Sequence, residues 1–403
     1  MNDRVKQHLD VIKENAVDII SEEEIISKLE NSFKTNQPLK LKVGFDPTSR
    51  DIHLGHTVLL RKLRKLQNLG HQVYFIIGDF TAKIGDPSGK TALRPVLNDE
   101  EIKDNASTYI DQASKILDKN KTKVIYNSIW YKDMVAADFL SLLSSYTVAR
   151  ILERDDFSQR IKENRPLTLL EIIYPLIQGY DSYKLSADIE FGGTDQKFNL
   201  IVGRHLQQFY GQTPQAIITM PILVGLDGKN KMSKSLNNYI GIFECPKDMF
   251  GKLMSISDEI MWEYFKFFSD QDIDEAKNMH PKQAKILLAQ ELVSFYHSQE
   301  LAQQEREEFE RVFSKGKLPE EILLYEINES PIDLIDVLFK SKIVSSKNDV
   351  RRLISQGAIS CLTVEDCTVA TVVKESIVVI PCEGVVFKIG KKRFLKVSFK
   401  EKI

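Results

Sequence analysis

The sequence predicts an α/β fold in which an open parallel sheet is followed by an α-helical domain and then by a small α/β module. Three observations predict this order. Apolar strand-like runs alternate with helical segments from about residue 39 to 225, helical patterns dominate residues 246–313, and β-branched runs return after residue 331. Such alternation is typical of a parallel sheet with helices on both faces, whose ligands collect at the carboxyl ends of the strands.

Length and composition limit the possible functions. A chain of 403 residues should hold two or three domains, because single cores stop growing near ~250 to 300 residues. Its 42% hydrophobic and 28% charged residues are typical of a soluble globular protein, and its net charge of −2 means that nucleic-acid contact needs a local basic patch. No apolar run approaches the ~18 residues of a membrane span, and the N-terminus lacks a signal-peptide pattern. We therefore expect a cytoplasmic protein without a membrane partner.

The first 240 residues are expected to hold an N-terminal arm and the sheet domain. Residues 1–35 show the apolar spacing of one or two amphipathic helices, and residues 36–240 make up the sheet domain. The strand-like runs of this domain are residues 39–43, 73–77, 123–126 and 216–220. A helical insertion at about 130–195 separates the two halves of the sheet, and apolar surface there suits a subunit interface.

The next segments are expected to be helical and then irregular. Residues 241–313 form an α-helical domain that ends in a long charged helix from Ala284 to Phe313. Residues 314–330 contain glycine and proline with few periodic apolar positions, which is typical of a linker.

Residues 331–403 read as a small basic module. Two short helices are expected near residues 334–338 and 350–354, and strands at 369–373, 377–380 and 395–399. The module carries 13 Lys and Arg against 8 Asp and Glu, so its net charge is 13 − 8 = +5. These cations can bind RNA phosphates, or they can form an ordinary solvated surface. They include Arg351, Arg352, Lys391, Lys392 and Arg393. The four cysteines of the chain show no CxxC spacing and lie beside no histidine, so no metal site is expected.

Residues 44–56 form a turn-rich segment between a predicted strand and a predicted helix. His53 and His56 then lie at the helix start, where free N–H groups and the helix dipole favour an anion. Gly55 between them lets a flat ring approach the backbone closely. The pair suits phosphate or ribose binding, although two histidines three apart also suit a metal site or a chance surface pair.

Residues 84–91 nearly match the phosphate-binding P-loop pattern. Ile84 stands where that motif requires its first glycine, so the motif fails by one residue. Lys90 and Arg94 can still present cations to phosphate, and Asp86 can pair with an ammonium group. A purely structural turn is the alternative.

Two further segments carry polar groups in apolar surroundings. Tyr174, Gln178 and Asp181 are spaced by four and three residues, so they share one helix face. A small zwitterionic ligand would satisfy them, as would an ordinary buried hydrogen-bond network. The paired glycines of residues 192–196 allow close backbone approach, and Asp195 and Gln196 can bind ribose or amide-like groups.

Residues 227–235 form a basic loop that reads Asp-Gly-Lys-Asn-Lys-Met-Ser-Lys-Ser. Its glycine, lysines and small residues suit a flap that closes on phosphates and stabilises charge in a transition state. A basic surface loop without a role is the alternative.

Taken together, these segments resemble one family. Residues 53–56, His-Leu-Gly-His, resemble the HIGH signature of class I aminoacyl-tRNA synthetases, and residues 231–235, Lys-Met-Ser-Lys-Ser, match their KMSKS signature in the same order. The similarity to tyrosyl-tRNA synthetases further includes residues 44–48, 85–90, 174–181 and 192–196. The final basic module is similar to the small RNA-binding domain of the bacterial and organellar members, so the resemblance covers essentially residues 1–403.

The resemblance implies a fold, a reaction and a set of partners. It implies a Rossmann-like catalytic domain with a KMSKS loop at residues 226–240, an anticodon-region domain at 241–313 and an RNA-binding domain at 331–403, in a homodimer. The family forms tyrosyl-adenylate from L-tyrosine and ATP with Mg²⁺, and then transfers tyrosine to the 3'-terminal adenosine of tRNA(Tyr).

The resemblance also implies the roles of individual residues. Those expected at the ATP phosphates or the departing pyrophosphate are Thr48, His53, His56, Lys90, Arg94, Lys231 and Lys234. Those expected elsewhere around ATP are Asp46, Gly55, Gly193, Asp195, Met232 and Ser233. Those expected around tyrosine are Asp86, Tyr174, Gln178, Asp181 and Gln196, with Asp181 accepting the phenol hydroxyl.

One position departs from the best-known members. Lys42 stands two residues before Gly44, where those members carry a tyrosine that touches the substrate phenol, although a second bacterial subgroup shares the lysine. The nearest alternative function is the tryptophan–tRNA ligase, which has the same fold and both signatures. More distant alternatives are a nucleotidyltransferase of the same superfamily and a non-catalytic RNA-binding protein, which should have lost the histidines and lysines of the signatures.

Overall fold

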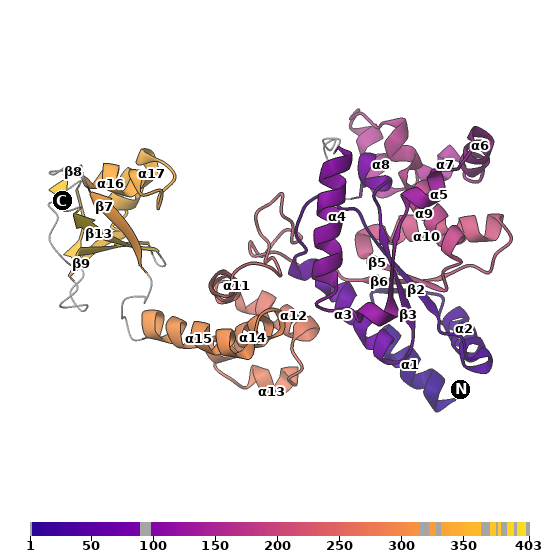
Figure 1. Ribbon diagram of the computed structural model, residues 1–403, viewed down its shortest axis with the longest axis horizontal. Helices are drawn as coiled ribbons and strands as arrows, with labels where there is room; N and C mark the ends of the chain where they lie inside the picture. The colour runs from indigo at the N-terminus through magenta and orange to yellow at the C-terminus, as the bar shows by residue number, and fades with distance from the viewer. Residues whose placement is uncertain are drawn as a thin grey trace. The chain divides into compact units, whose positions relative to one another are not determined.

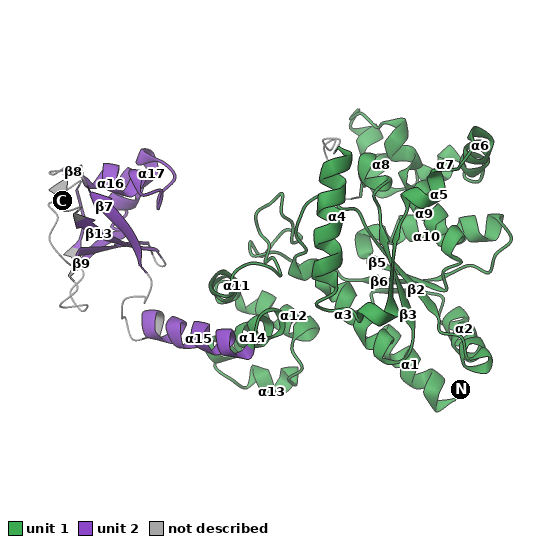
Figure 2. Ribbon diagram, in the orientation of Figure 1, with its two compact units in different colours: residues 1–298 green, residues 299–403 purple. Residues whose placement is uncertain are grey.

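The computed structural model describes residues 2–88, 98–314, 322–327, 332–363, 371–375, 378–379, 385–390 and 393–399. The chain forms two compact units, residues 1–298 and 299–403 (Figure 2). Each unit is described by itself. None of the helices within the described ranges is long and apolar enough to cross a membrane.

The first unit is built on a six-stranded sheet with the strand order β1-β6-β5-β2-β3-β4 (Figure 1). Its strands are β1 Asp18–Ile20, β2 Lys40–Phe45, β3 Gln72–Ile77, β4 Thr122–Tyr126, β5 Ile189–Gly193 and β6 Ala216–Met220. All neighbours pair in parallel except β1, which runs antiparallel to β6. The order reverses between β2 and β5, and such a switch point opens a crevice at the carboxyl ends of the strands. The parallel sheet and its predicted strand positions are thus confirmed.

The N-terminal arm contains two helices and one strand. Helices α1 Asp3–Lys13 and α2 Glu22–Thr35 begin at capping residues Asn2 and Ser21, whose side chains accept backbone hydrogen bonds. The purely helical prediction is wrong at β1, which pairs with β6 at the sheet edge. A run of three residues is too short to show a period, and its partner strand lies about 200 positions along the chain.

Helices of the sheet domain connect the strands. They are α3 Leu54–Asn68, α4 Asp99–Ala113 and α10 Lys197–Phe209, with short 3-10 turns at Thr81–Lys83, Lys119–Lys121 and Thr194–Gln196. The predicted helix after His56 is α3, and its apolar positions Val58, Leu60, Leu63 and Leu66 are buried. The first turn of α3 carries no acidic residue, which leaves its positive end available to an anion.

The insertion is helical, as expected, but shorter than predicted. Its helices are α5 Ser128–Tyr131, α6 Ala136–Ser144, α7 Val148–Ile151, α8 Asp155–Lys162 and α9 Leu169–Leu185. Residues 189–193 at its expected end form β5 instead. This strand pairs on both sides with other strands, and short apolar runs cannot be assigned by period alone.

The helical region after the sheet contains α11 Pro246–Leu253, α12 Asp258–Phe268, α13 Ile273–Lys277 and α14 Pro281–Tyr296. The prediction of one long helix from Ala284 to Phe313 is wrong, because α14 ends at Tyr296. His297 has φ −123° and ψ −94°, outside the helical region. Neither glycine nor proline marks this break in the sequence, so the usual stop signal was missing.

The second unit begins with α15 Gln299–Phe309 and a π-helical turn at Glu310–Ser314. Its two predicted short helices are confirmed as α16 Leu334–Lys340 and α17 Lys347–Ser355. They pack on the apolar side chains of a five-stranded sheet with the order β10-β9-β12-β13-β7. The strands of the unit are β7 Leu323–Ile327, β8 Ile332–Asp333, β9 Ile359–Thr363, β10 Thr371–Val372, β11 Val378–Val379, β12 Val385–Ile389 and β13 Arg393–Phe399.

Strand β7 corrects the predicted linker. It pairs in parallel with β13, so a linker cannot extend through residue 327. Only Ile327 of this strand is buried, which explains why the run showed no apolar period. The strands expected at 369–373, 377–380 and 395–399 correspond to β10, β11 and β13, while residues 369, 370, 377, 380, 391 and 392 lie outside the described residues.

Candidate active site

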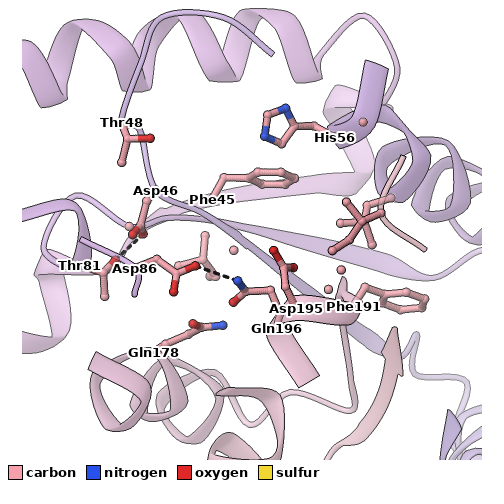
Figure 3. A pocket seen from close by; sticks show the side chains of 18 of the residues that line it. Phe45, Asp46, Thr48, His56, Thr81, Asp86, Gln178, Phe191, Asp195 and Gln196 are labelled. Atoms are coloured by element: carbon pink, nitrogen blue, oxygen red, sulfur yellow. Dashed lines mark hydrogen bonds between the residues drawn. The ribbon is translucent and has the colours of Figure 1, made fainter. Parts of the chain in front are cut away.

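A pocket of about 520 Å³ opens at the switch point between β2 and β5 (Figure 3). The predicted site residues that line it are Asp46, Thr48, His53, Gly55, His56, Asp86, Tyr174, Gln178, Asp181, Gly193, Asp195, Gln196, Lys231, Met232, Ser233 and Lys234. Lys90 and Arg94 lie outside the described residues. Segments between residues 42 and 235 therefore meet at this one cavity.

The two histidines mark the N-terminus of α3. His53 is the N-cap residue, and its backbone N–H donates to Nδ1 of His56 at 3.2 Å. Burial, with the nearby Lys234, lowers the pKa of His56 to about 3. Burial also holds the pKa of His53 well below its usual range. Both rings are therefore neutral at physiological pH, and the proton of His56 lies on Nε2 because Nδ1 accepts.

Gly55 is required by close approach. A Cβ at this position would lie 3.0 Å from Nδ1 and Cε1 of the His53 ring. The backbone N–H of Gly55 also donates to the sulfur of Met232 at 3.4 Å. This contact joins the histidine segment to the basic loop, so the two signatures touch.

The basic loop lies against the histidine segment. Nζ of Lys234 donates to Oγ of Ser49 at 2.7 Å and to the backbone carbonyl of Asp51. Burial lowers the pKa of Lys234 to about 8, which Asp51 partly offsets. Nζ of Lys231 lies 3.1 Å from Oδ2 of Asp195.

The loop is held in this position by one buried amide. The side chain of Asn238 accepts a hydrogen bond from the backbone N–H of Ser233 at 2.8 Å. It also donates to the carboxylate of Asp227 at 3.0 Å and to the backbone carbonyl of Lys231 at 3.1 Å. Of the three lysines of the loop, Lys231 and Lys234 line the pocket.

At the end of β2, Asp46 joins three elements. Its carboxylate accepts a hydrogen bond from the Tyr174 hydroxyl of α9 at 2.8 Å. It also accepts one from Oγ1 of Thr81 at 2.7 Å (Figure 3). The backbone N–H of Thr48 donates to the Asp46 carbonyl at 2.7 Å. The turn after the strand is thus held in one geometry by contacts beyond its own sequence.

Asp86, Gln178 and Gln196 form a polar wall of the pocket. Oδ2 of Asp86 accepts from Nε2 of Gln196 at 2.8 Å (Figure 3). Nδ2 of Asn199 donates to Oε1 of Gln178 at 3.0 Å and to Oε1 of Gln196 at 3.1 Å. A single buried amide therefore sets the orientation of two pocket glutamines.

Arg154 holds that amide in turn. Its guanidinium donates to Oδ1 of Asn199 at 3.2 Å and to Oγ of Ser88 at 3.0 Å, and pairs with Asp156 at 2.6 Å. Arg154 belongs to the helical insertion, so the insertion supports the pocket through this chain of contacts.

Asp181 on α9 supplies a buried carboxyl group to the pocket wall. Oδ2 accepts from Nδ2 of Asn127 at 3.3 Å, whereas buried Oδ1 has no hydrogen-bond partner among the described residues. Burial raises the pKa of Asp181 to about 7. An unpartnered buried oxygen that lines a cavity is a strong acceptor for a ligand hydroxyl.

Sequence reasoning missed several residues of the site. Thr81, Asn127, Asn199 and Arg154 are small or polar residues that carry no motif. Most of their contacts in the site span 21 to 111 positions of the chain. Only contact with a residue that a motif had already identified could have singled them out. The described residues contain no cluster of three or more His, Cys, Asp or Glu side chains that could hold a metal ion.

Comparison with known proteins agrees with this geometry. Residues 34–314 match the family model of class I tRNA synthetases (W and Y). The chain is 47% identical to a tyrosine–tRNA ligase of Desulfotalea psychrophila, over 98% of each chain. It is 50% identical to one of Aquifex aeolicus, over 88% of this chain and 90% of the relative.

A solved structure has the same fold. The tyrosyl-tRNA synthetase of Archaeoglobus fulgidus, determined in complex with L-tyrosine, is 25% identical. It covers 75% of this chain and 99% of its own, with a TM-score of 0.60. The relatives are named for tyrosine, so the tryptophan alternative is not favoured. By its sequence, its pocket and these relatives, the chain belongs to the tyrosine–tRNA ligases of the class I aminoacyl-tRNA synthetase family.

Proposed function

We propose that the pocket binds L-tyrosine and ATP side by side, joins them as tyrosyl-adenylate, and then passes tyrosine to the 3'-terminal adenosine of tRNA(Tyr). The unpartnered buried Oδ1 of Asp181 carries this proposal. It places a hydroxyl acceptor in the same cavity as the signature histidines and lysines. A phenol can reach the acceptor while the amino-acid end faces the nucleotide groups.

Tyrosine is proposed to lie along α9. Asp181 accepts the phenol hydroxyl, and Gln196 lies near the substrate carboxylate. Asp86, Tyr174 and Gln178 receive the α-ammonium group, because all three present oxygen atoms to the pocket. The existing bonds of these residues to Gln196, Asp46 and Asn199 pre-orient them, which lowers the entropy lost on binding.

ATP is proposed to lie between the start of α3 and the basic loop. Thr48, His53, His56, Lys231 and Lys234 contact the phosphates or the departing pyrophosphate, together with Lys90 and Arg94 from outside the described residues. Asp195 receives the ribose hydroxyls, while Asp46, Gly55, Gly193, Met232 and Ser233 line the nucleotide site. Mg²⁺ is proposed to enter with ATP as the counter-ion of its phosphates.

The reaction needs no general base. The tyrosine carboxylate is already ionised and attacks the α-phosphate, so catalysis consists of positioning and charge neutralisation. Neutral His56, whose Nε2 carries the proton, donates to developing negative charge without taking up a proton. Lys231 must leave Asp195 when ATP enters, because the same carboxylate is proposed to hold the ribose.

Tyrosine-dependent exchange of labelled pyrophosphate into ATP tests the function. We expect exchange with tyrosine and none with tryptophan, whereas faster exchange with tryptophan would reinstate the alternative.

His56→Ala should slow adenylate formation by over ~10²-fold and leave tyrosine affinity near normal, because the His56 side chain is proposed to stabilise charge that develops in the transition state. An equal loss of tyrosine affinity would contradict this role.

A homodimer is proposed from the surface of the insertion. Its exposed large apolar side chains are Ile129, Val135, Leu140, Val148, Ile161, Leu169 and Leu170. Leu169 is 79% exposed and Leu140 is 65% exposed. Apolar side chains gathered in one segment are typical of a subunit interface.

The remaining parts are proposed to bind tRNA. Residues 241–313 would reach the anticodon region, and the basic residues 331–403 would bind RNA phosphates through cations such as Arg351 and Arg352. Both arginines are exposed on α17. An enzyme that charges tRNA is proposed to act in the cytoplasm, where translation takes place.

A further inference from the structure

Lys42 is a lysine buried beside the tyrosine site. It lies in the middle of β2 and its side chain is 1% exposed. Nζ donates to the backbone carbonyl of Gln178 at 3.1 Å and to Oγ of Ser182 at 2.6 Å, and pairs with Oε1 of Glu190 at 2.8 Å. An ammonium group has three protons, so these three acceptors use all of them. Lys42 therefore has no donor left for a substrate phenol.

Glu190 completes a cluster of buried polar groups. It lies on β5 beside Lys42, with its side chain 2% exposed. Its Oε2 accepts from Oγ of Ser182 at 2.8 Å and from Nε2 of Gln215. Gly203 of α10 leaves room for this cluster, because a Cβ there would lie 2.9 Å from Nε2 of Gln215 and 3.1 Å from Oγ of Ser182.

Stability alone does not explain such a pair. The desolvation free energy of two buried charges can exceed the free energy gained from their attraction. Replacing such a pair by apolar side chains of equal volume is therefore often neutral or stabilising. The pair also lines the pocket and holds α9 on both sides of Asp181, through Gln178 and Ser182. Its position therefore indicates a task at Asp181.

The groups that face Asp181 come from several elements. Lys42 of β2 favours its ionised form, whereas Glu190 of β5 and Asp46 after β2 disfavour it. The Asn127 amide donates to it, and burial, together with the nearby Asp181, holds the pKa of the Tyr131 hydroxyl of α5 well above its usual range. Burial raises the pKa of Asp181 to about 7, so small changes in its neighbours alter its charge near neutral pH.

Resting on the proposed function, we propose that the buried Lys42–Glu190 pair determines tyrosine specificity through Asp181 without contacting the substrate. Lys42 favours the ionised form of the Asp181 carboxylate, and Glu190 disfavours it. An ionised carboxylate makes a charge-assisted hydrogen bond to a phenol. Beside the bare ring of phenylalanine, Oδ1 of the same carboxylate stays buried without a hydrogen bond, which is costly. Lys42 and Glu190 are thus positioning residues.

Opposite changes in two variants test the proposal. The ratio of tyrosine to phenylalanine affinity is measured by equilibrium dialysis with the full chain between pH 5.5 and 7.5. Both amino acids share the α-ammonium and carboxylate, so the ratio isolates the phenol contact. In the wild type the ratio should fall as pH drops through the Asp181 pKa, because a protonated Asp181 no longer penalises phenylalanine.

Lys42→Met removes the positive charge that favours ionised Asp181. The tyrosine-to-phenylalanine affinity ratio should therefore begin to fall at a higher pH than in the wild type. If the profile moves by one pH unit, the ratio at pH 7 should be roughly tenfold lower. Glu190→Gln keeps the shape and removes the negative charge, so the fall should move to a lower pH. Tyrosine should then bind more tightly than in the wild type below pH 6.5. Damage to the fold cannot improve binding, so Glu190→Gln alone suffices if Lys42→Met fails to fold.

Displacement of both profiles in the same direction, or of neither, would overturn the proposal. The proposed function is tested separately by exchange in the wild type. An active wild type with unmoved variant profiles would reject only the role of the pair, whereas a wild type without tyrosine-dependent exchange would reject the function itself.

Discussion

Lys234 shows how burial prepares a single residue for phosphate chemistry. Its ammonium group lies in the pocket wall near His56 and Asp51, and burial lowers its pKa to about 8. A partly dehydrated ammonium group gains more from a phosphate than a solvated one, because less water must be displaced when the phosphate binds. His53 and His56 stay neutral across the same pH range. The charge of this wall near neutral pH therefore depends on lysines and not on histidines.

A pH profile checks this assignment. Because Lys234 is charged only below its pKa, kcat/KM for ATP in the exchange reaction should fall as pH rises above about 8. Lys234→Arg stays charged at every accessible pH, so its kcat/KM should be lower throughout but flat above pH 8. The assignment to Lys234 fails if the arginine variant shows the same alkaline fall.

Two side-chain amides of α10, those of Asn199 and Gln207, donate hydrogen bonds to α9. Asn199 on α10 donates to Gln178 on α9 and to Gln196 just before α10. Its amide oxygen accepts a hydrogen bond from Arg154 of the insertion. Gln207, two turns further along α10, donates to the carbonyls of Ser182 and Ala187. The first amide supports the pocket wall through Gln178 and Gln196, which line the pocket, while the second only supports the packing of the helix.

The two amides provide a matched pair of variants. Asn199→Asp removes the donor that orients both glutamines, so KM for tyrosine should rise by about tenfold, the equivalent of one hydrogen bond at ~1.4 kcal/mol. Gln207→Glu makes the same chemical change in the same helix, and it should lower the melting temperature with little effect on KM for tyrosine. Equal effects of both variants on KM would show that the helix packing, not the amide, matters.

Over the whole molecule, the insertion connects two proposed roles. Its outer surface carries the exposed apolar side chains of the proposed dimer, and its Arg154 supports the tyrosine wall through Asn199. A dimer would bury Leu140 and Leu169, which are 65% and 79% exposed in the single chain. Loss of the dimer is then expected to loosen the site as well.

Charge placed on this surface tests the assembly. Leu140→Glu with Leu169→Glu should give monomers in sedimentation equilibrium and raise KM for tyrosine, because a buried unpaired carboxylate opposes association. Val17→Glu changes a side chain of similar exposure, 57%, outside the insertion and should leave both properties unchanged. A double variant that still dimerises would place the interface elsewhere.

The sequence by itself determined the parallel sheet, the helix after His56 and the residues that carry the two signatures. These depend on apolar periods and on motifs that are local in the chain. It did not determine β1, β5 or β7, because short strands exist only through distant partners. The apolar pattern also predicted a continuous helix through His297, where the structure shows that α14 has ended.

The state of the site was decided only by the tertiary structure. Lys42 was identified as a departure from the family pattern, yet nothing in the sequence showed that three acceptors saturate its ammonium group. Asn127, Asn199 and Arg154 carried no motif at all. Hydrogen bonds and burial depend on which distant segments meet, and that is a property of the folded chain. The sequence determined which chemical groups are available, and the tertiary structure decided their charge and orientation.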